Sequence, residues 1–544
     1  MKSQKTIYHF HSLSQVFLVI GIVVVLNVLI APLVLRVDLT QGKLYTISKS
    51  TKKIVKDLKS PVTLKVYMSN PEELPEDVIS IRQDVLDLVD EYQKAGSANI
   101  IVEKINPTGN DTLSQEAYSF GILPLQGGKM KQTEIAIRQY YAGIAVVFQD
   151  KSVPVPAITD VNNLEYEITA AINKMTRQKV PTIGIVSGHD ESLLDDIKQA
   201  LKKQYNVENV DTTSAGRIPD AYDALVIAGP KKDFTDIEKY ELDQFVMRGG
   251  KLAVLMDGVG INDQYLMATP ANLSLNSLLD AYGVRVNSDI VLDPYSNAFL
   301  PFQTGNGGGG LLMKYPAFPV IMQDGFDKDS VISGKLFSMT FPFPSSLTVS
   351  SKNTETKIAE LVKTTDMSFA IDGANAILSP DQINKLPATD KKARTLAVLI
   401  TGKIESAFKG KPIPGADITS KDSKQNTSAA KFIQDTTAGS VLVISSNRFL
   451  NTDYLKYLIN SMQALSENFV LFANAVDVLA QGEALVDIRS RSLANRPLLP
   501  VEEGTALLIS IGNIFASALL SVVVGGAVYY IRRRKGKKAR ERYA

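Results

Sequence analysis

The sequence predicts an α/β fold in which two membrane helices flank a large body. Two apolar runs without charged residues lie near the ends of the chain, at residues 16–35 and 505–531. Between them, segments with the two-residue period of strands alternate with segments that have the spacing of amphipathic helices. A new series of strands and helices begins at Val180. We therefore expect two domains between the two membrane helices.

Each apolar run is long enough to cross a bilayer. As a helix, residues 16–35 would span ~30 Å, the thickness of the hydrocarbon core. A cleaved signal peptide is the alternative for this run, but the run is too long for a typical apolar core and no A-x-A-like site follows it. The tails at 1–15 and 532–544 are basic, and basic tails mark the cytoplasmic side. The sequence thus predicts a two-pass membrane protein, with both termini cytoplasmic and the body extracytoplasmic.

Residues 36–60 are expected to form an ordered, membrane-proximal collar and a helix. The helix would begin after Ser48, which is an N-cap candidate, because apolar residues with helical spacing follow it. An ordered collar would fix the orientation of the body relative to the membrane. A segment that only attached the body to the membrane could equally be flexible. The collar residues with groups that could reach lipid headgroups or bond locally are Arg36, Asp38, Thr40, Lys43, Tyr45 and Ser48.

Residues 61–179 read β-α-β-α-β-β-α, which is the order of a thioredoxin-like domain. Residues 180–500 contain buried strands that alternate with helices, which predicts a parallel sheet covered on both faces. This second domain resembles the class I glutamine amidotransferase-like fold. It carries an irregular insertion at about 288–394 and a polar segment at 409–430 that we expect to be mobile.

The composition excludes several functions. The chain has 544 residues and no cysteine, which excludes thiol redox chemistry and the cysteine nucleophile of amidotransferases. The chain between the basic tails is mildly acidic, which argues against a nucleic-acid partner. No phosphate-binding G-x-x-x-x-G-K-[ST] motif occurs, so the chain is not an ATPase. No cofactor is expected, and no spacing of His, Asp and Glu suggests a metal site.

The end of the first strand of the parallel sheet is the candidate binding site. Open α/β sheets bind ligands at the carboxyl ends of their strands, and the next helix offers free N–H groups. No nucleophile and no orienting group can be named here, so catalysis is not expected. We favour the interpretation that Asp190 or Ser192 caps the helix and His189 is incidental, and binding of a ligand or partner is the alternative. The candidate residues are Ser187, Gly188, His189, Asp190 and Glu191.

Three arginines precede the second apolar run closely. They are Arg489, Arg491 and Arg496. They could contact lipid headgroups or an acidic partner surface, and a solvated or structural role for each is equally consistent with the sequence.

Five stretches in a fixed order resemble GldG-type proteins, the auxiliary subunits of bacterial ABC-2-type export systems known from gliding motility. They are RVDLTQGKLYTISKST (36–51), PVTLKVY (61–67), LEYEITAAI (164–172), LITGKIESAF (399–408) and NFVLFANAVDVLAQGEALVDIRSRS (468–492). The resemblance implies a non-catalytic subunit of the bacterial inner membrane that works beside a permease, a separate ATPase and membrane lipid. It leaves open a second copy of the chain or a paralogue as a further partner.

Two other functions remain open at this stage. The chain could be a stand-alone envelope receptor or enzyme that uses the crevice near His189, or a structural scaffold between envelope layers. The sequence reveals neither a transported substrate nor a direction of transport.

Overall fold

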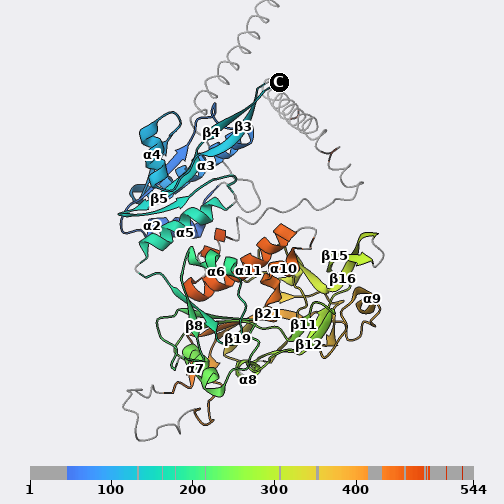
Figure 1. Cartoon of the computed structure of the whole chain (residues 1–544). Helices are drawn as coiled ribbons and strands as arrows, with labels where there is room; N and C mark the ends of the chain where they lie inside the picture. The colour runs from blue at the N-terminus through green and yellow to red at the C-terminus, as the bar shows by residue number, and fades with distance from the viewer. Residues whose placement is uncertain are drawn as a thin grey trace, which may run out of the picture. The chain divides into compact units, whose positions relative to one another are not determined.

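The structure is a computed structural model. It describes residues 46–131, 134–161, 163–177, 179–214, 216–304, 308–350, 354–414, 432–456, 458, 461–482, 485–486, 488–489, 510, 512 and 530. The chain separates into two compact units, Met1–Ala494 and Asn495–Ala544. All elements named below belong to the first unit (Figure 1).

The predicted membrane helices require a correction. Among the described residues, no helix combines the length and the apolar character that crossing a bilayer needs. The two 21-residue helices, α3 (Glu76–Gly96) and α11 (Ser461–Gln481), carry acidic residues and contribute apolar side chains to the cores of the protein. The fold class with two membrane helices and the two-pass inner-membrane localisation are therefore wrong as descriptions of this structure. The runs at 16–35 and 505–531 lie outside the described residues, apart from 510, 512 and 530.

The first domain is built on a four-stranded sheet with the order β2-β1-β5-β6. Strand β1 runs parallel to β2 and antiparallel to β5. The strands are β1 (Val62–Met68), β2 (Ile100–Ile105), β5 (Ala142–Phe148) and β6 (Lys151–Val155). Helices α2 (Lys49–Lys56), α3 and α5 (Leu164–Thr176) contribute to one apolar core with the sheet, and α4 (Asp111–Ser119) contributes to another.

Most elements expected in this domain lie where the sequence pattern predicts them. Ser48 is the N-cap of α2, since its hydroxyl accepts a hydrogen bond from the Thr51 N–H. The prediction missed the strand β3 (Leu125–Lys131), which pairs with β4 (Glu134–Tyr140), and the short helix η1 (Ser97–Asn99) after α3. We therefore describe this domain by its sheet order and keep the thioredoxin-like likeness as a prediction.

The second domain is built on a seven-stranded sheet with the order β19-β21-β24-β10-β9-β7-β8. The five strands from β24 to β8 are parallel, and β21 and β19 complete the sheet in antiparallel pairs. The strands are β7 (Thr182–Ser187), β8 (Asn206–Asp211), β9 (Ala224–Ala228), β10 (Lys251–Leu255), β19 (Thr356–Lys363), β21 (Thr395–Gly402) and β24 (Ser440–Ile444).

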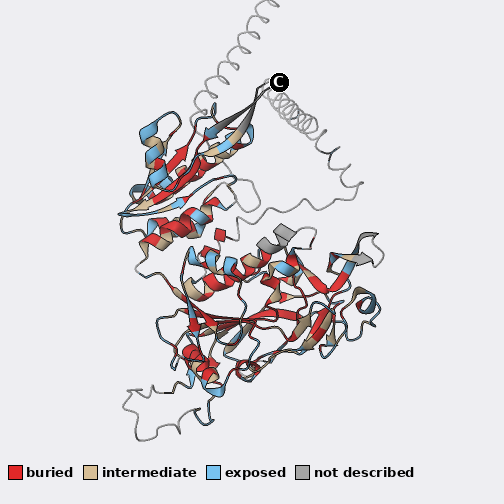
Figure 2. Ribbon diagram, viewed as in Figure 1, coloured by how far each residue is buried: buried red, intermediate tan, exposed pale blue. Residues whose placement is uncertain are grey.

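Helices cover both faces of this sheet (Figure 1). Helices α6 (Asp195–Lys202) and α11 pack on one face, and α7 (Asp236–Met247) and α8 (Asn276–Leu279) pack on the other. In β9, Leu225 faces one core and Val226 the other, and all five residues of the strand are buried. Figure 2 shows that buried residues dominate the strands of this sheet. Burial of each such side chain stabilises the fold by about 1.5–3 kcal/mol, so the continuous apolar strands of the sequence reflect a sheet that is covered on both sides.

The insertion expected at about 288–394 is more regular than its sequence suggests. It supplies β19, which is an edge strand of the main sheet. The segments YPAFPV and FPFPSS, which resemble loops in the sequence, form an aromatic cluster in which the Phe318 and Phe343 rings meet edge to face at 4.9 Å. The remaining elements of the insertion are β14 (Asp289–Leu292), β15 (Asn297–Thr304), β16 (Gly308–Met322), η2 (Gln323–Gly325), β17 (Ser338–Thr340), β18 (Leu347–Val349), β20 (Phe369–Asp372) and α9 (Pro380–Ile383).

Short elements complete the second domain. They are β11 (Val259–Asn262), β12 (Met267–Pro270), β13 (Val284–Val286), β22 (Ile404–Glu405), β23 (Asp435–Thr436), η4 (Arg448–Leu450) and α10 (Thr452–Leu455). Of the polar segment at 409–430, only residues 409–414 are described, so its expected mobility stays a prediction.

The ESAF part of the LITGKIESAF motif binds a buried carboxylate on α7. Asp243 accepts hydrogen bonds from the Ser406 hydroxyl at 2.6 Å, the Ala407 N–H at 2.8 Å and the Tyr282 hydroxyl at 2.9 Å. Burial raises the pKa of Asp243, and these hydrogen bonds counteract part of that rise. The motif therefore holds the segment after β21 against α7.

Candidate functional site

The five candidate residues after β7 form a tight turn at the carboxyl edge of the large sheet. Gly188 and Asp190 have positive φ angles of 117° and 58°. The Gly188 value lies outside the range that other residues adopt easily, so glycine suits this position. The turn brings Ser187–Glu191 together as the sequence predicts, and their role in ligand or partner binding stays a prediction.

His189 is not an open catalytic group, because its side chain is 3% exposed. Its Nδ1 lies 3.2 Å from a Glu191 carboxylate oxygen, and its Nε2 lies 3.2 Å from a carboxylate oxygen of Glu238 in α7. The ring also stacks on Phe234 at a centroid distance of 3.7 Å. A neutral imidazole has one N–H and can donate to only one of the two carboxylates. Through its contacts with Glu191 and Glu238, the His189 side chain connects the turn after β7 to the start of α7.

Glu238 is the partner that the sequence pattern did not reveal. It takes part in a capping box at the start of α7: its carboxylate accepts from the Thr235 N–H at 2.6 Å, and the Thr235 hydroxyl accepts from its N–H. The T-x-x-E spacing of this capping box is readable in the sequence, but its approach to His189 is a tertiary contact. The expectation that Asp190 or Ser192 caps the next helix is wrong. The N-cap residue of α6 is Leu194, and no side chain forms a capping hydrogen bond there.

The neighbouring strand ends complete the edge of the sheet. Asn447, after β24, donates to the Ser192 hydroxyl at 3.1 Å, and its own N–H donates to Asp257, after β10, at 2.8 Å. Gly229, after β9, has a φ of 61°, and a Cβ atom there would lie 2.6 Å from the Asn447 amide nitrogen. Close packing and internal hydrogen bonds thus occupy the carboxyl edge where the sequence suggests a crevice.

A second polar cluster surrounds Arg489, which lies beyond α11. The guanidinium is 2.7 Å from the carboxylate of Asp477 in α11 and donates to the Asn474 side chain at 3.1 Å. It also hydrogen-bonds to the Tyr166 hydroxyl of α5 and lies 4.3 Å from the centre of that ring. Arg489 is therefore buried and paired, which fits the structural alternative for this arginine.

The electrostatics of this cluster follow from its burial. Burial raises the pKa of Asp477, while the nearby Arg489 and the hydrogen bond from the Tyr205 hydroxyl oppose that rise. Burial by itself lowers the pKa of Arg489, but the Asp477 and tyrosine neighbours make the net shift upward. Burial and the Asp477 charge raise the pKa of Tyr205. Burial likewise raises the pKa of Tyr166, so Tyr166 and Tyr205 are both neutral. Tyr166 connects α5 to Arg489, and Tyr205, which lies between α6 and β8, connects that region to Asp477 of α11.

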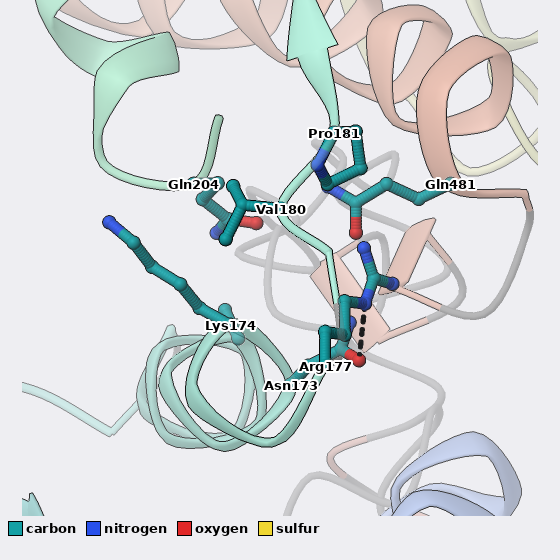
Figure 3. Close-up of a pocket in the computed structure, with 8 residues that line it drawn as sticks. Asn173, Lys174, Arg177, Val180, Pro181, Gln204 and Gln481 are labelled. Atoms are coloured by element: carbon teal, nitrogen blue, oxygen red, sulfur yellow. Dashed lines mark hydrogen bonds between the residues drawn. The ribbon is translucent and has the colours of Figure 1, made fainter. Parts of the chain in front are cut away.

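A small hollow lies beside this cluster (Figure 3). Arg177 donates to the Asn173 side chain at 2.8 Å, and burial lowers the pKa of Arg177. Lys174 donates to the Lys203 carbonyl oxygen at 2.5 Å. The lining residues are Ala170, Asn173, Lys174, Arg177, Val180, Pro181, Gln204 and Gln481. The hollow is polar and cationic, and it lies between α5 and the elements around β7.

The start of the described chain is tied to α5. The Glu165 carboxylate accepts from the Ser48 N–H and from the Thr51 hydroxyl, both at 2.6 Å. Thr51 also lies 3.3 Å from the Thr169 hydroxyl. Glu165, Tyr166 and Thr169 belong to LEYEITAAI, so this motif binds the α2 segment on one side and Arg489 on the other. The candidate residues Arg36, Asp38, Thr40, Lys43, Tyr45, Arg491 and Arg496 lie outside the described residues.

Three polar residues that join distant parts of the chain were missed as site candidates. Glu165, Tyr166 and Asp477 lie in stretches that the sequence singles out, and a charged or phenolic residue on an otherwise apolar helix was the available signal. Across the described ranges, no group of three or more His, Asp or Glu side chains is placed to hold a metal ion.

These features define the chain as an α/β protein with two separate main sheets, in which several motif residues bind other parts of the same chain. Residues 180–480, more than half of the chain, match the family model described as "ABC-type uncharacterized transport system". The chain belongs to this family, whose members are auxiliary components of ABC-type transport systems. Residues 41–147 match a domain of unknown function, DUF7088.

The chain is also similar to one protein over nearly its full length. This relative, named as an uncharacterized protein of Borreliella burgdorferi, is 23% identical over 519 residues, which cover 92% of this chain and 94% of the relative. Among solved structures, the mmIFT52 N-terminal domain aligns with 56% of this chain and 98% of its own, at 15% identity and a TM-score of 0.32. A likeness at that level carries no functional argument.

Proposed function

We propose that this chain is a non-catalytic, GldG-type accessory subunit of an ABC export complex, which docks on a permease and works beside a separate ATPase. The family match supports an auxiliary role in such a system. The sequence has no phosphate-binding loop, so ATP hydrolysis would come from another subunit. In this role the body contributes a surface that contacts the permease or the transported substrate.

The observation that carries the proposal is the internal use of the motif side chains. Glu165 binds Ser48 and Thr51, Asp243 binds the ESAF segment, and Asp477 binds Arg489. An enzyme needs reactive groups that reach a substrate, whereas these groups are buried against their own chain. Because these side chains bind other parts of the same chain, they favour a protein that acts as a rigid body and contacts its partner through its surface.

The same contacts support an ordered collar at residues 36–60. The structure describes the end of that segment from Thr46 onward. There the Ser48 N–H donates to Glu165 of α5, and the Ser48 hydroxyl caps α2. We propose that the collar positions the body for its partner. Replacement of residues 37–47 by Gly and Ser of equal length tests this role, since full transport activity in that variant would refute it.

Affinity purification tests the main proposal. A tagged full-length chain, isolated in mild detergent and analysed by mass spectrometry, should bring down one permease and one ATPase in reproducible ratios. An untagged strain is the control for carry-over. Isolation of the chain alone, under conditions that preserve another ABC complex of the same cell, would contradict the proposal.

A stand-alone receptor or enzyme that uses the crevice near His189 has less support. The ring is buried between Glu191 and Glu238 and stacked on Phe234, so it does not face a substrate. A purely structural scaffold shares the rigid body with our proposal. The purification separates the two, because a scaffold would not bring down an ATPase.

A further inference from the structure

Helix α2 presents a basic surface that the described chain does not neutralise. Within residues 49–59 there are five lysines and a single acidic residue, Asp57. Four of the lysines are exposed and Lys52 is half-buried. In the described structure none of the five forms an ion pair. The five are Lys49, Lys52, Lys53, Lys56 and Lys59; we call them the α2 lysines.

The placement of these lysines does not favour the helix itself. Lys49 and Lys52 lie in the first turn, which holds no acidic residue, although the helix dipole favours negative charge there. The Lys49–Lys53 and Lys52–Lys56 pairs are four residues apart, a spacing at which like charges destabilise a helix. Only Lys53 and Lys56, in the last turn, suit the dipole. Helix stability therefore does not explain the charge of α2.

Tertiary contacts compensate for this local cost and fix the direction of the surface. Val55 is fully buried, and Thr51 is fully buried and bonded to Glu165. Ser48 caps the helix, and the Asn99 side chain donates to the Lys56 carbonyl oxygen at 3.3 Å. The lysines thus project from a rigid element, and a local departure from sequence preference that the fold maintains is typical of functional surfaces.

The distribution of apolar side chains indicates what kind of anion this surface fits. Helices that bind lipid surfaces insert an apolar face below the headgroups. In α2 the apolar side chains are used elsewhere: Val55 lies in the domain core, and Ile54 and the following Leu58 pack against it. Only charge remains on the outer face, which fits an acidic protein surface better than a lipid surface.

We propose that the α2 lysines form a docking site for an acidic, Asp- and Glu-rich segment of a partner protein. The partner is defined by charge complementarity to five unpaired lysines, four on α2 and Lys59 just after it. This inference goes beyond the proposed transport role and does not require it, because an acidic partner of any function would fit.

A binding experiment with the full-length chain tests the docking site. The probe is a fluorescent oligoglutamate peptide, measured at low and high salt. Lys49→Glu with Lys52→Glu should weaken binding about tenfold at low salt, and added salt should weaken wild-type binding. Both changes place acidic residues in the first helical turn, where they favour the helix, so this variant should keep the urea midpoint of the wild type.

Lys385→Glu with Lys391→Glu is the matched control, since both lysines are exposed in the second domain. This control should bind the peptide like the wild type. An equal loss of peptide binding in the two double variants would show that the peptide is attracted non-specifically to exposed lysines, and it would overturn the proposal. So would preferential binding to phosphatidylglycerol vesicles or to oligothymidine over oligoglutamate.

Discussion

The Arg489 guanidinium lies 2.7 Å from the Asp477 carboxylate, at a site where the two side chains are 10% and 2% exposed. Asp477 belongs to α11, whereas Arg489 lies beyond it and also contacts Tyr166 of α5. The pair therefore joins the end of the first compact unit to elements from both domains. These contacts hold residues 488–489 against α11 and α5.

Arg489→Met should lower the free energy of unfolding by about 3–5 kcal/mol, because it leaves the Asp477 charge buried without its partner. Urea denaturation followed by circular dichroism measures the loss. Lys403→Met is the matched control: its ion pair with Glu355 is exposed to solvent, and such pairs contribute little to stability. Arg489→Met with Asp477→Asn should cost less than the sum of the single changes, and strict additivity would show that the pair is not coupled.

Glu165→Ala should loosen α2 without unfolding the first domain. The change removes the acceptor for the Ser48 N–H and the Thr51 hydroxyl, and each unsatisfied buried group costs about 1–3 kcal/mol. Hydrogen exchange of the amides in residues 49–56 should become faster. Glu167→Ala is the control on the same helix, because Glu167 is exposed. Unchanged exchange in Glu165→Ala would mean that α2 is held by its apolar contacts alone.

Glu467 predicts a pH dependence of stability. Burial raises the pKa of Glu467 to about 7, and the hydrogen bond from the Phe337 N–H opposes that rise only partly. A carboxyl group with a raised pKa favours the folded state when protonated, so the contribution present below pH 4.5 is lost as the pH rises to about 7. The change amounts to about 3 kcal/mol.

Glu467→Gln removes this titration and should flatten the pH profile of the urea midpoint between these limits. The wild type should lose stability relative to the variant as the pH rises. A constant difference between the two proteins across the range would contradict the assignment. Glu360→Gln provides a comparison at a less buried carboxylate in β19.

His189→Ala separates the structural role of this residue from a chemical one. The change leaves the Glu191 and Glu238 carboxylates facing a cavity, so stability should fall by about 2 kcal/mol or more. Asp190→Ala should change stability by less than about 1 kcal/mol, because Asp190 pairs with Lys232 at the surface. Recovery of permease and ATPase should persist in both variants at a permissive temperature. Loss of a measured activity with unchanged stability would instead favour the receptor or enzyme hypothesis.

Local patterns in the sequence predicted a large part of the fold. Ser48 caps α2 as expected, β1 overlaps the PVTLKVY stretch, and α5 begins with LEYEITAAI. Parallel strands alternate with helices after Val180, as the sequence pattern predicts. These elements have a regular apolar period or a capping residue, which act over a few neighbouring positions. The insertion was harder to predict, since aromatic and proline-rich segments show no such period and β19 pairs with a strand far along the chain.

The candidate site was only partly predictable. The turn at Ser187–Glu191 follows from the strand that precedes it, but the burial of His189 depends on Glu238 and Phe234 from another element. Arg489 shows the same limit, because its apparent place near a membrane run gave no sign of its partners Asp477 and Tyr166.

By itself the sequence determined the chemistry that this protein lacks and the order of its elements. The absence of cysteine and of a phosphate-binding loop is a property of composition, and helix and strand periods are local. Only the tertiary structure decided which polar side chains meet, because contacts such as Tyr166–Arg489 join residues separated by 323 positions. Burial in those contacts then set the charge environment of motif residues such as Asp477 and Arg489.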